Sequence, residues 1–291
     1  MTLGIDIQGL TVRYGDVTAI DNLSLHLDGG KIYGLLGRNG SGKTTLLSVL
    51  AAYRKAAAGQ VRVGSADPFE NAVLTEQICL VRESGDLVDG ESVKRTLARA
   101  ATFRPAWDAE LADKLLDTFQ LSLRRGVAKL SHGQRSALGI TIGLASRAPL
   151  TLLDESYLGL DAPSRYAFYD VLLADYMEHP RTFVISTHLI EEVADLFEEV
   201  VIIDHGRLIT HDETESLRLR GTAVTGPARA VERYTNGLTV LSEQRLGGTT
   251  SAAVFGSVTD DMRRRASNEG LELGPISLQD LFVHLTARRP M

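Results

Sequence analysis

The sequence predicts an α/β fold, in which helices cover both faces of a mainly parallel sheet, followed by a small α+β appendage. Short, fully apolar segments such as "LTLLDE" and "TFVIST" are typical of buried parallel strands. These segments alternate with helical patterns, as they do in doubly covered sheets. From about residue 220 the chain becomes richer in Gly and Thr, which marks the start of the appendage.

The N-terminal elements follow from their hydrophobic patterns. Strands are expected at "IDIQGLTVRY", "LSLHL" and "IYGLLG", and then a helix that begins near Gly42 and runs through "TTLLSVLAAYRK". Two more strands are expected at "QVRVGS" and "QICLVRES". Between about residues 84 and 148 the pattern is helical and is broken at Pro105. A helical subdomain is therefore inserted into the strand-rich order.

The later elements alternate more regularly. Helices are expected at "SHGQRSALGITIGLASR", "SRYAFYDVLLADYMEH" and "LIEEVADLFE", and a strand pair at "EVVIIDHGRLI". Beyond residue 220 the order reads βαββαβ with a final helix at "SLQDLFVHLTARR", which would suit a ferredoxin-like domain. The expected domains are therefore residues 1–220 and 221–291.

Composition and charge exclude several functional classes. The chain of 291 residues has a formal net charge of −6, which argues against broad binding to nucleic acid. Cys79 is the only cysteine, so no intrachain disulfide can form and a reducing compartment fits. The N-terminus does not read as a signal peptide, and no apolar run approaches the roughly 20 residues that a membrane span needs. A function at a membrane would require a partner chain that spans it.

The stretch "GLLGRNGSGKTTLL" carries a phosphate-binding P-loop. Its glycines and the Lys-Thr pair match G-x-x-x-x-G-K-[ST], and it lies between an apolar strand and a helical pattern, as that motif requires. Backbone N–H groups and the helix N-terminus would hold the phosphates. The lysine would reach the β- and γ-phosphates and the first threonine would bind Mg²⁺. The alternative, a simple glycine turn, fits this context poorly. The expected nucleotide-binding residues are Gly37, Arg38, Asn39, Gly40, Ser41, Gly42, Lys43, Thr44 and Thr45.

Further motifs follow the P-loop in a fixed order. They are "LSHGQ" at residues 130–134, "LTLLDES", "GLDA" at residues 159–162, and "ISTH", which ends at His188. In this order the set resembles the ATP-binding cassette (ABC) ATPases, over about residues 3–220. The resemblance implies a P-loop NTPase core with an antiparallel β-subdomain and an inserted helical subdomain.

The resemblance also implies catalytic roles. Asp154 would hold the Mg²⁺ shell, Glu155 would act as general base for the attacking water, and His188 would contact the γ-phosphate. Taken singly, an acidic pair after a strand is often a helix cap, and a histidine there is often only a polar strand end. In family order after a P-loop, the functional interpretation is favoured, and ATP is hydrolysed rather than only bound.

Other nucleotide contacts are implied at a distance from the P-loop. In ABC ATPases the signature helix contacts the γ-phosphate bound by the other subunit of a head-to-tail dimer. Ser131 and Gly133 would provide that contact, and Gln134 and Asp161 belong to the same nucleotide-contacting set. Ser131 is also an ordinary helix N-cap, and both roles can hold together. Tyr14 would stack on adenine, although an exposed tyrosine on a strand is common.

Two positions depart from the family pattern. The third signature residue is His132 where glycine is usual, and we expect it to be solvent-exposed rather than a metal ligand. The segment after "QICLV" places Glu83 where a Mg²⁺-sensing glutamine is usual. As a hard oxygen donor, Glu83 could bind Mg²⁺ and take part in catalysis, and it would then work only with the metal bound. Alternatively, Glu83 is a solvated strand-end residue and the sensor has been lost.

The predicted function is that of an ATP-hydrolysing subunit of an ABC transporter, with ATP and Mg²⁺ as cofactors. It would be a cytoplasmic protein, peripheral at the inner face of the cell membrane, with a membrane-spanning permease and a second ABC ATPase subunit as partners. The stretch "RESGDLVDGESVKRTLARAATFRPAWD", which contains Trp107, and the tail "SLQDLFVHLT" resemble the YtrB-like subgroup, which is linked to envelope stress and antimicrobial-peptide export. Export is therefore expected.

Two alternatives remain open. One is a soluble, non-transport ABC ATPase that acts on nucleic acid or the ribosome. Its best support is the basic cluster "MRRRAS" near Arg264, which is more simply a solvated helix face, so no nucleic acid is expected. The other is an ATP-binding switch without turnover. The transported substrate is not readable from this chain.

Overall fold

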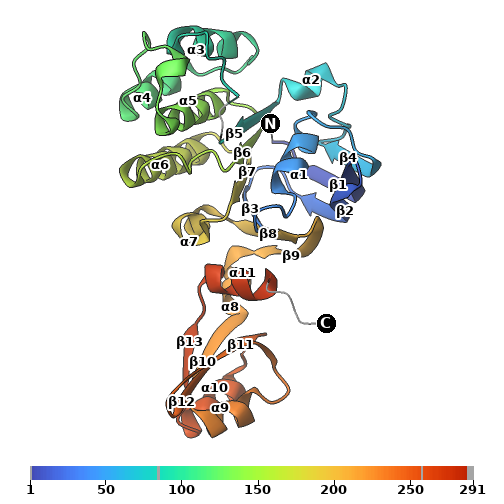
Figure 1. Cartoon of the computed structure of the whole chain (residues 1–291), viewed down its shortest axis with the longest axis vertical. Helices are drawn as coiled ribbons and strands as arrows, with labels where there is room; N and C mark the ends of the chain where they lie inside the picture. The colour runs from blue at the N-terminus through green and yellow to red at the C-terminus, as the bar shows by residue number, and fades with distance from the viewer. Residues whose placement is uncertain (1, 84–85, 257, 287–291) are drawn as a thin grey trace. The chain divides into compact units, whose positions relative to one another are not determined.

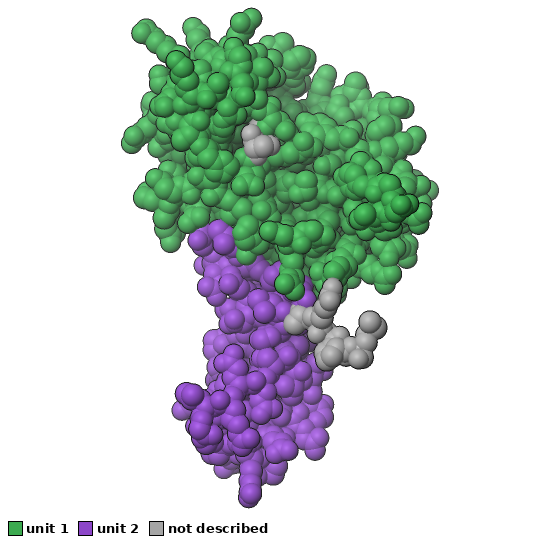
Figure 2. All heavy atoms as spheres, in the orientation of Figure 1, with its two compact units in different colours: residues 1–188, 201–210 green, residues 189–200, 211–291 purple. Residues whose placement is uncertain are grey.

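The computed structural model describes residues 2–83, 86–256 and 258–286. It divides into two compact units, residues 1–188 with 201–210 and residues 189–200 with 211–291 (Figure 2). The start of the expected helical subdomain at residue 84 and the end of the expected final helix, residues 287–289, lie outside the described residues. Among the helices that are described, none combines the length and the apolarity that crossing a bilayer requires.

The first unit contains a three-stranded antiparallel sheet in the order β2-β1-β4. Its strands are β1 (Ile5–Tyr14), β2 (Val17–Leu27) and β4 (Ala58–Val63). Alternating residues of β1 and β2 are buried in the core of this unit, as the period of a half-buried strand predicts.

A six-stranded sheet follows the order β5-β6-β7-β3-β8-β9. Its strands are β3 (Ile32–Leu36), β5 (Ile78–Arg82), β6 (Leu150–Asp154), β7 (Thr182–Thr187), β8 (Glu199–Asp204) and β9 (Arg207–Glu213). The neighbours among β5, β6, β7 and β3 pair in parallel. All residues of β3, β6 and β7 are buried, as expected for strands covered on both faces. The carboxyl ends of these strands therefore meet at one edge of the sheet.

Helices of the first unit connect and cover these strands (Figure 1). They are α1 (Lys43–Leu50), α2 (Ala72–Thr75), α3 (Val93–Thr102), α4 (Ala109–Thr118), α5 (His132–Ala145) and α6 (Ala162–Glu178), with a 3₁₀ turn at Val127–Lys129. Helices α3 and α4 both pack on α5 and form the inserted helical block. The α/β fold with its antiparallel and helical insertions is therefore confirmed.

The second unit contains a four-stranded antiparallel sheet in the order β11-β12-β10-β13. The strands are β10 (Gly221–Pro227), β11 (Thr239–Leu246), β12 (Thr249–Phe255) and β13 (Glu272–Pro275). The helices are α7 (Ile190–Val193), α8 (Thr214–Leu219), α9 (Ala228–Thr235), α10 (Asp260–Asn268) and α11 (Leu278–Thr286), with a 3₁₀ turn at Ala194–Leu196. From β10 to β13 the element order is βαββαβ, and the sheet order is that of ferredoxin-like domains.

Three local features differ from the sequence-based expectations. Helix α1 ends at Leu50 rather than continuing to Lys55, because Ala52 takes a left-handed conformation with φ of 62° and the Tyr53 N–H bonds back to the Ser48 carbonyl. The expected helix at "LIEEVADLFE" is one turn of α-helix followed by the 3₁₀ turn. The short helices α2 and α8 were not expected.

The division between the units also differs from a boundary at residue 220, which lies inside the second unit. Helices α7 and α8 precede this residue in sequence, yet both contact α11. Arg218 of α8 forms an ion pair with Asp195 at 2.7 Å, which ties these segments to each other.

Candidate nucleotide-binding site

The P-loop forms a pocket of about 390 Å³ between β3 and α1. Gly42 is the N-cap of α1 and has φ of 108°, a conformation that L side chains rarely adopt. A Cβ atom there would lie 2.7 Å from the Ala19 carbonyl oxygen, so both backbone strain and a backbone clash exclude a side chain. The residues that line the pocket are Ala19, Asn39, Gly40, Ser41, Gly42, Lys43, Thr44, Thr45 and Glu155. Gly37 and Arg38 adjoin it, since their carbonyl oxygens accept hydrogen bonds from Lys43 Nζ.

Two predicted catalytic side chains, Lys43 and Glu155, line this pocket, and a third, His188, contacts Glu155. Lys43 Nζ lies 3.2 Å from Glu155 Oε1, and His188 Nδ1 lies 3.2 Å from Glu155 Oε2. The Lys43 side chain is 5% exposed and that of Glu155 is 19% exposed, so this contact is largely shielded from water. Because β6 and β7 are parallel neighbours, residues that are more than thirty positions apart in sequence reach the same edge of the sheet.

Ser186 holds the acidic pair in place, a role that the sequence motifs did not indicate. The fully buried Ser186 hydroxyl donates a hydrogen bond to Asp154 Oδ1 at 2.6 Å and accepts one from the Glu155 N–H at 3.2 Å. Glu155 also has a positive φ of 51°. The only sequence signal was a polar residue within the apolar strand "TFVIST", which by itself does not identify a partner.

The signature segment lies on a second pocket, of about 550 Å³. Ser131 caps α5: its hydroxyl accepts a hydrogen bond from the Gln134 N–H at 3.2 Å, and the Gln134 side chain accepts one from the Ser131 N–H at 3.1 Å. The N-cap interpretation of Ser131 is therefore correct. Gly133 and Asp161 line the same pocket, and hydrogen bonds from Ser164 hold the pKa of Asp161 below its usual value.

Helix α5 and the loop before α6 approach closely in this second pocket. A Cβ atom on Gly133 would lie 2.7 Å from the Gly159 carbonyl oxygen. A Cβ atom on Gly159 would lie 2.9 Å from two ring atoms of His132. The two backbone segments therefore approach too closely for a side chain on Gly133, and the His132 ring lies beside Gly159.

The two departures from the family pattern contact each other. His132 Nε2 lies 3.5 Å from Glu83 Oε1, with side chains 60% and 50% exposed. A second ion pair, between Arg135 of α5 and Asp89, joins the same two segments. Glu83 therefore contacts the signature helix of its own chain, a pairing that was not foreseen. Its proposed role toward Mg²⁺ stays a prediction.

Tyr14 is at the end of β1 and is 46% exposed. Its hydroxyl lies 3.5 Å from Thr45 Oγ1, which connects it to the phosphate pocket. One face of the ring is covered by the guanidinium of Arg54, whose Cζ lies 3.5 Å from the ring centroid. The predicted adenine contact is thus adjacent to the P-loop.

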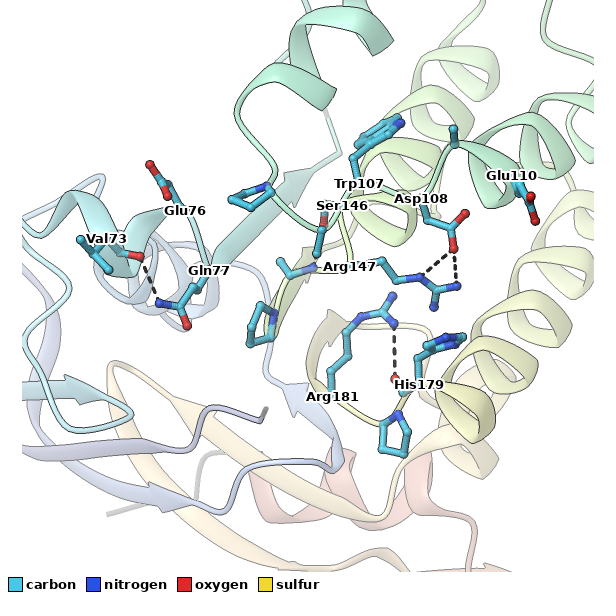
Figure 3. A pocket seen from close by; sticks show the side chains of 16 residues that line it. Val73, Glu76, Gln77, Trp107, Asp108, Glu110, Ser146, Arg147, His179 and Arg181 are labelled. Atoms are coloured by element: carbon cyan, nitrogen blue, oxygen red, sulfur yellow. Dashed lines mark hydrogen bonds and ion pairs between the residues drawn. The ribbon is translucent and has the colours of Figure 1, made fainter.

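A larger pocket of about 960 Å³ lies at the opposite edge of the sheet (Figure 3). Gln77, Pro149 and Arg181, which precede β5, β6 and β7, line it together with Trp107. Its lining includes most of a chain of ion pairs, in the order Asp108, Arg147, Asp175 and Arg181. Burial and the charge of Arg147 lower the pKa of Arg181 to about 10.

This network has a structural role. Asp108 caps α4 by accepting a hydrogen bond from the Leu111 N–H at 2.8 Å, and that bond, with Arg147, lowers the pKa of Asp108. The ion pairs therefore connect the helical block to the starts of the parallel strands, away from the nucleotide site.

Comparisons with known proteins agree with this site. Residues 20–157 match the family described as ABC transporter. A daunorubicin resistance ATP-binding protein of Streptomyces coeruleorubidus is 29% identical over 97% of this chain and 95% of its own. The Nod factor export ATP-binding protein I of Neorhizobium galegae is 27% identical over 99% of this chain and 86% of its own. A sulfate/thiosulfate import ATP-binding protein of Bordetella pertussis is 32% identical over 71% of this chain and 61% of its own.

Solved structures show the same fold. An ATP-binding subunit of an ABC transporter superposes with a TM-score of 0.66 at 20% identity, covering 74% of this chain and 91% of the other. A dimeric ATP-binding cassette in a post-hydrolysis state, bound to ADP and phosphate, superposes with a TM-score of 0.63 at 20% identity, covering 72% and 98%. The motifs, the fold and the relatives lead to one conclusion: this chain contains an ATPase domain of the ABC transporter family.

Proposed function

We propose that this chain hydrolyses ATP to energise a separate membrane permease, and that the transporter is an exporter. The convergence of Lys43, Glu155 and His188 on the P-loop pocket carries the catalytic part of this proposal. A phosphate cradle alone would explain binding. A carboxylate placed between a phosphate-binding lysine and a histidine supplies in addition a base for the attacking water.

The residues present fit Mg²⁺ as a cofactor. Asp154 is a buried carboxylate at the end of β6, and Thr44 offers a hydroxyl at the start of α1, so both are hard oxygen donors. Bound Mg²⁺ would neutralise charge on the phosphates. The protein's own contribution is to orient the phosphates through the P-loop and to hold Glu155 by the Ser186 hydrogen bond.

A second cassette is proposed to complete the site. The N-terminus of α5, with Ser131 and Gly133, is at the protein surface on its own pocket and can present N–H groups and a hydroxyl to an anion. In a head-to-tail dimer that anion is the γ-phosphate in the partner's P-loop. The partner is then a second copy or a related cassette.

Export is favoured by the extent of the similarity. The relatives named for drug resistance and Nod factor export align over 97% and 99% of this chain and so include its C-terminal unit. The relative named for sulfate import aligns over 71%. We therefore propose that the C-terminal unit belongs to an exporter subunit at the inner face of the membrane. Membership of the YtrB-like subgroup stays a prediction.

The test is phosphate release by the purified full chain with ATP and Mg²⁺, alone and with a candidate permease in detergent or nanodiscs, the candidate being any polytopic membrane protein that a neighbouring gene encodes. We expect turnover that the membrane protein stimulates and Glu155→Gln abolishes. Stimulation by nucleic acid with no effect of the membrane protein would favour the soluble, non-transport ATPase. ATP binding without turnover in either condition would favour a binding switch.

A further inference from the structure

Arg54 covers one face of the predicted adenine contact, the Tyr14 ring. Its guanidinium carbon lies 3.5 Å from the centroid of the Tyr14 ring, the distance of a stacked cation–π pair. Its Nη2 donates a hydrogen bond to the Arg13 carbonyl oxygen. Its Nε is buried from solvent and has no hydrogen-bond partner of its own. The stacking contact and the hydrogen bond to Arg13 therefore hold the guanidinium against the ring.

The rest of the Tyr14 ring remains accessible. The residue is 46% exposed although one face lies on Arg54. Its hydroxyl lies beside Thr45, in the first turn of the helix that begins at the P-loop. A base extending from phosphates in that pocket would meet the accessible face of the ring.

We propose that Arg54 is a positioning residue for base recognition. It holds the Tyr14 ring in one orientation, so that the ring is a preformed platform for the adenine of ATP. This inference rests on the proposed ATP-binding function. Two contacts set the platform, one from Thr45 at the start of α1 and one from Arg54 just after its end. Preorganising a contact surface strengthens binding because less ordering remains to be done when the ligand arrives.

The opposite role would be competition, in which Arg54 occupies the place of the base and must leave. The hydrogen bond to the Arg13 carbonyl and the stacking contact with the Tyr14 ring argue against this, since both would be lost on departure. The two roles predict changes of opposite sign when Arg54 is removed.

The experiment measures the Kd of ATP and of tripolyphosphate, which has phosphates but no base. The proteins are the wild type, Arg54→Ala, Arg54→Lys and the control Arg13→Ala. We expect Arg54→Ala to weaken ATP binding about two- to fivefold, which corresponds to the free energy of an exposed cation–π contact. The same variant should leave tripolyphosphate binding unchanged. Arg54→Lys keeps the positive charge but loses the planar group that stacks on the ring. Its Kd for ATP should therefore lie between those of the wild type and Arg54→Ala.

The control removes an exposed positive charge beside Tyr14 but keeps the carbonyl that Arg54 uses. It should bind both ligands as the wild type does. In a Tyr14→Ala background, Arg54→Ala should have no further effect on ATP binding. Unchanged or tighter ATP binding by Arg54→Ala, or an equal loss for tripolyphosphate, would overturn the proposal. A wild type that binds ATP without hydrolysing it would instead contradict the proposed function and leave this comparison valid.

Discussion

Replacing Glu155 by Gln tests the site most directly, because this carboxylate contacts both Lys43 and His188. Lys43 and Glu155 are 3.2 Å apart and largely buried. At an effective dielectric of about 20, unit charges at that separation interact by about 5 kcal/mol, and the solvation of the separated charges offsets most of it. We expect bound ATP to draw Lys43 away from this contact. Glu155→Gln therefore makes Lys43 more available to phosphate while it removes the base.

We expect two opposite changes in Glu155→Gln. The Kd of ATP should fall by about tenfold, equivalent to about 1.4 kcal/mol, or roughly a quarter of the gross interaction. The single-turnover rate of hydrolysis should fall by about 10²- to 10⁴-fold, the usual contribution of a general base. Calorimetric titration measures the first and phosphate release the second. Glu110→Gln, the same chemical change at the pocket on the other edge of the sheet, is the matched control.

Hydrolysis at the wild-type rate in Glu155→Gln would refute the assignment of the base. A loss of hydrolysis with unchanged or weaker ATP binding would refute the competition for Lys43. The two readouts therefore test separate parts of the reasoning.

Three further outcomes follow from the structure. Glu83→Gln should change the Mg²⁺ dependence of ATP hydrolysis if this residue acts with the metal, and an unchanged dependence in a Mg²⁺ titration would remove that role. Gly133→Ala should abolish turnover and retain ATP binding, because its Cβ would lie 2.7 Å from the Gly159 carbonyl oxygen on the signature surface; full turnover would contradict this close approach. Asp175→Ala should lower the free energy of unfolding by about 3–5 kcal/mol, measured with denaturant, because it leaves Arg181 buried without a carboxylate; a loss below about 1 kcal/mol would mean that Arg181 finds another partner.

The parts of the site that were predictable share a simple physical basis. The backbone turns into α1 through a conformation at Gly42 that only glycine adopts readily, so the glycine in the sequence directly indicates this turn. Asp154 ends one apolar strand and His188 follows the next, and parallel strands bring their ends to a common edge. Local patterns of this kind need no knowledge of distant packing.

The parts that could not be predicted depend on contacts between distant segments. The pairing of Glu83 with His132 needs the placement of the helical block, which no local pattern encodes. The ion pairs from Asp108 to Arg181 join residues of different elements, and no regular spacing in the sequence indicates that these residues meet. The end of α1 was misplaced because Ala52, rather than a glycine, adopts the left-handed conformation.

The close approach of Gly133 to Gly159 has a mechanical consequence. A hinge needs space in which its two sides can slide, and here a Cβ atom on Gly133 would already lie 2.7 Å from the Gly159 carbonyl oxygen. We therefore expect the turn that carries Asp161 and the helix end that carries Ser131 to move together. A partner cassette would therefore contact the turn and the helix end together, or contact neither of them.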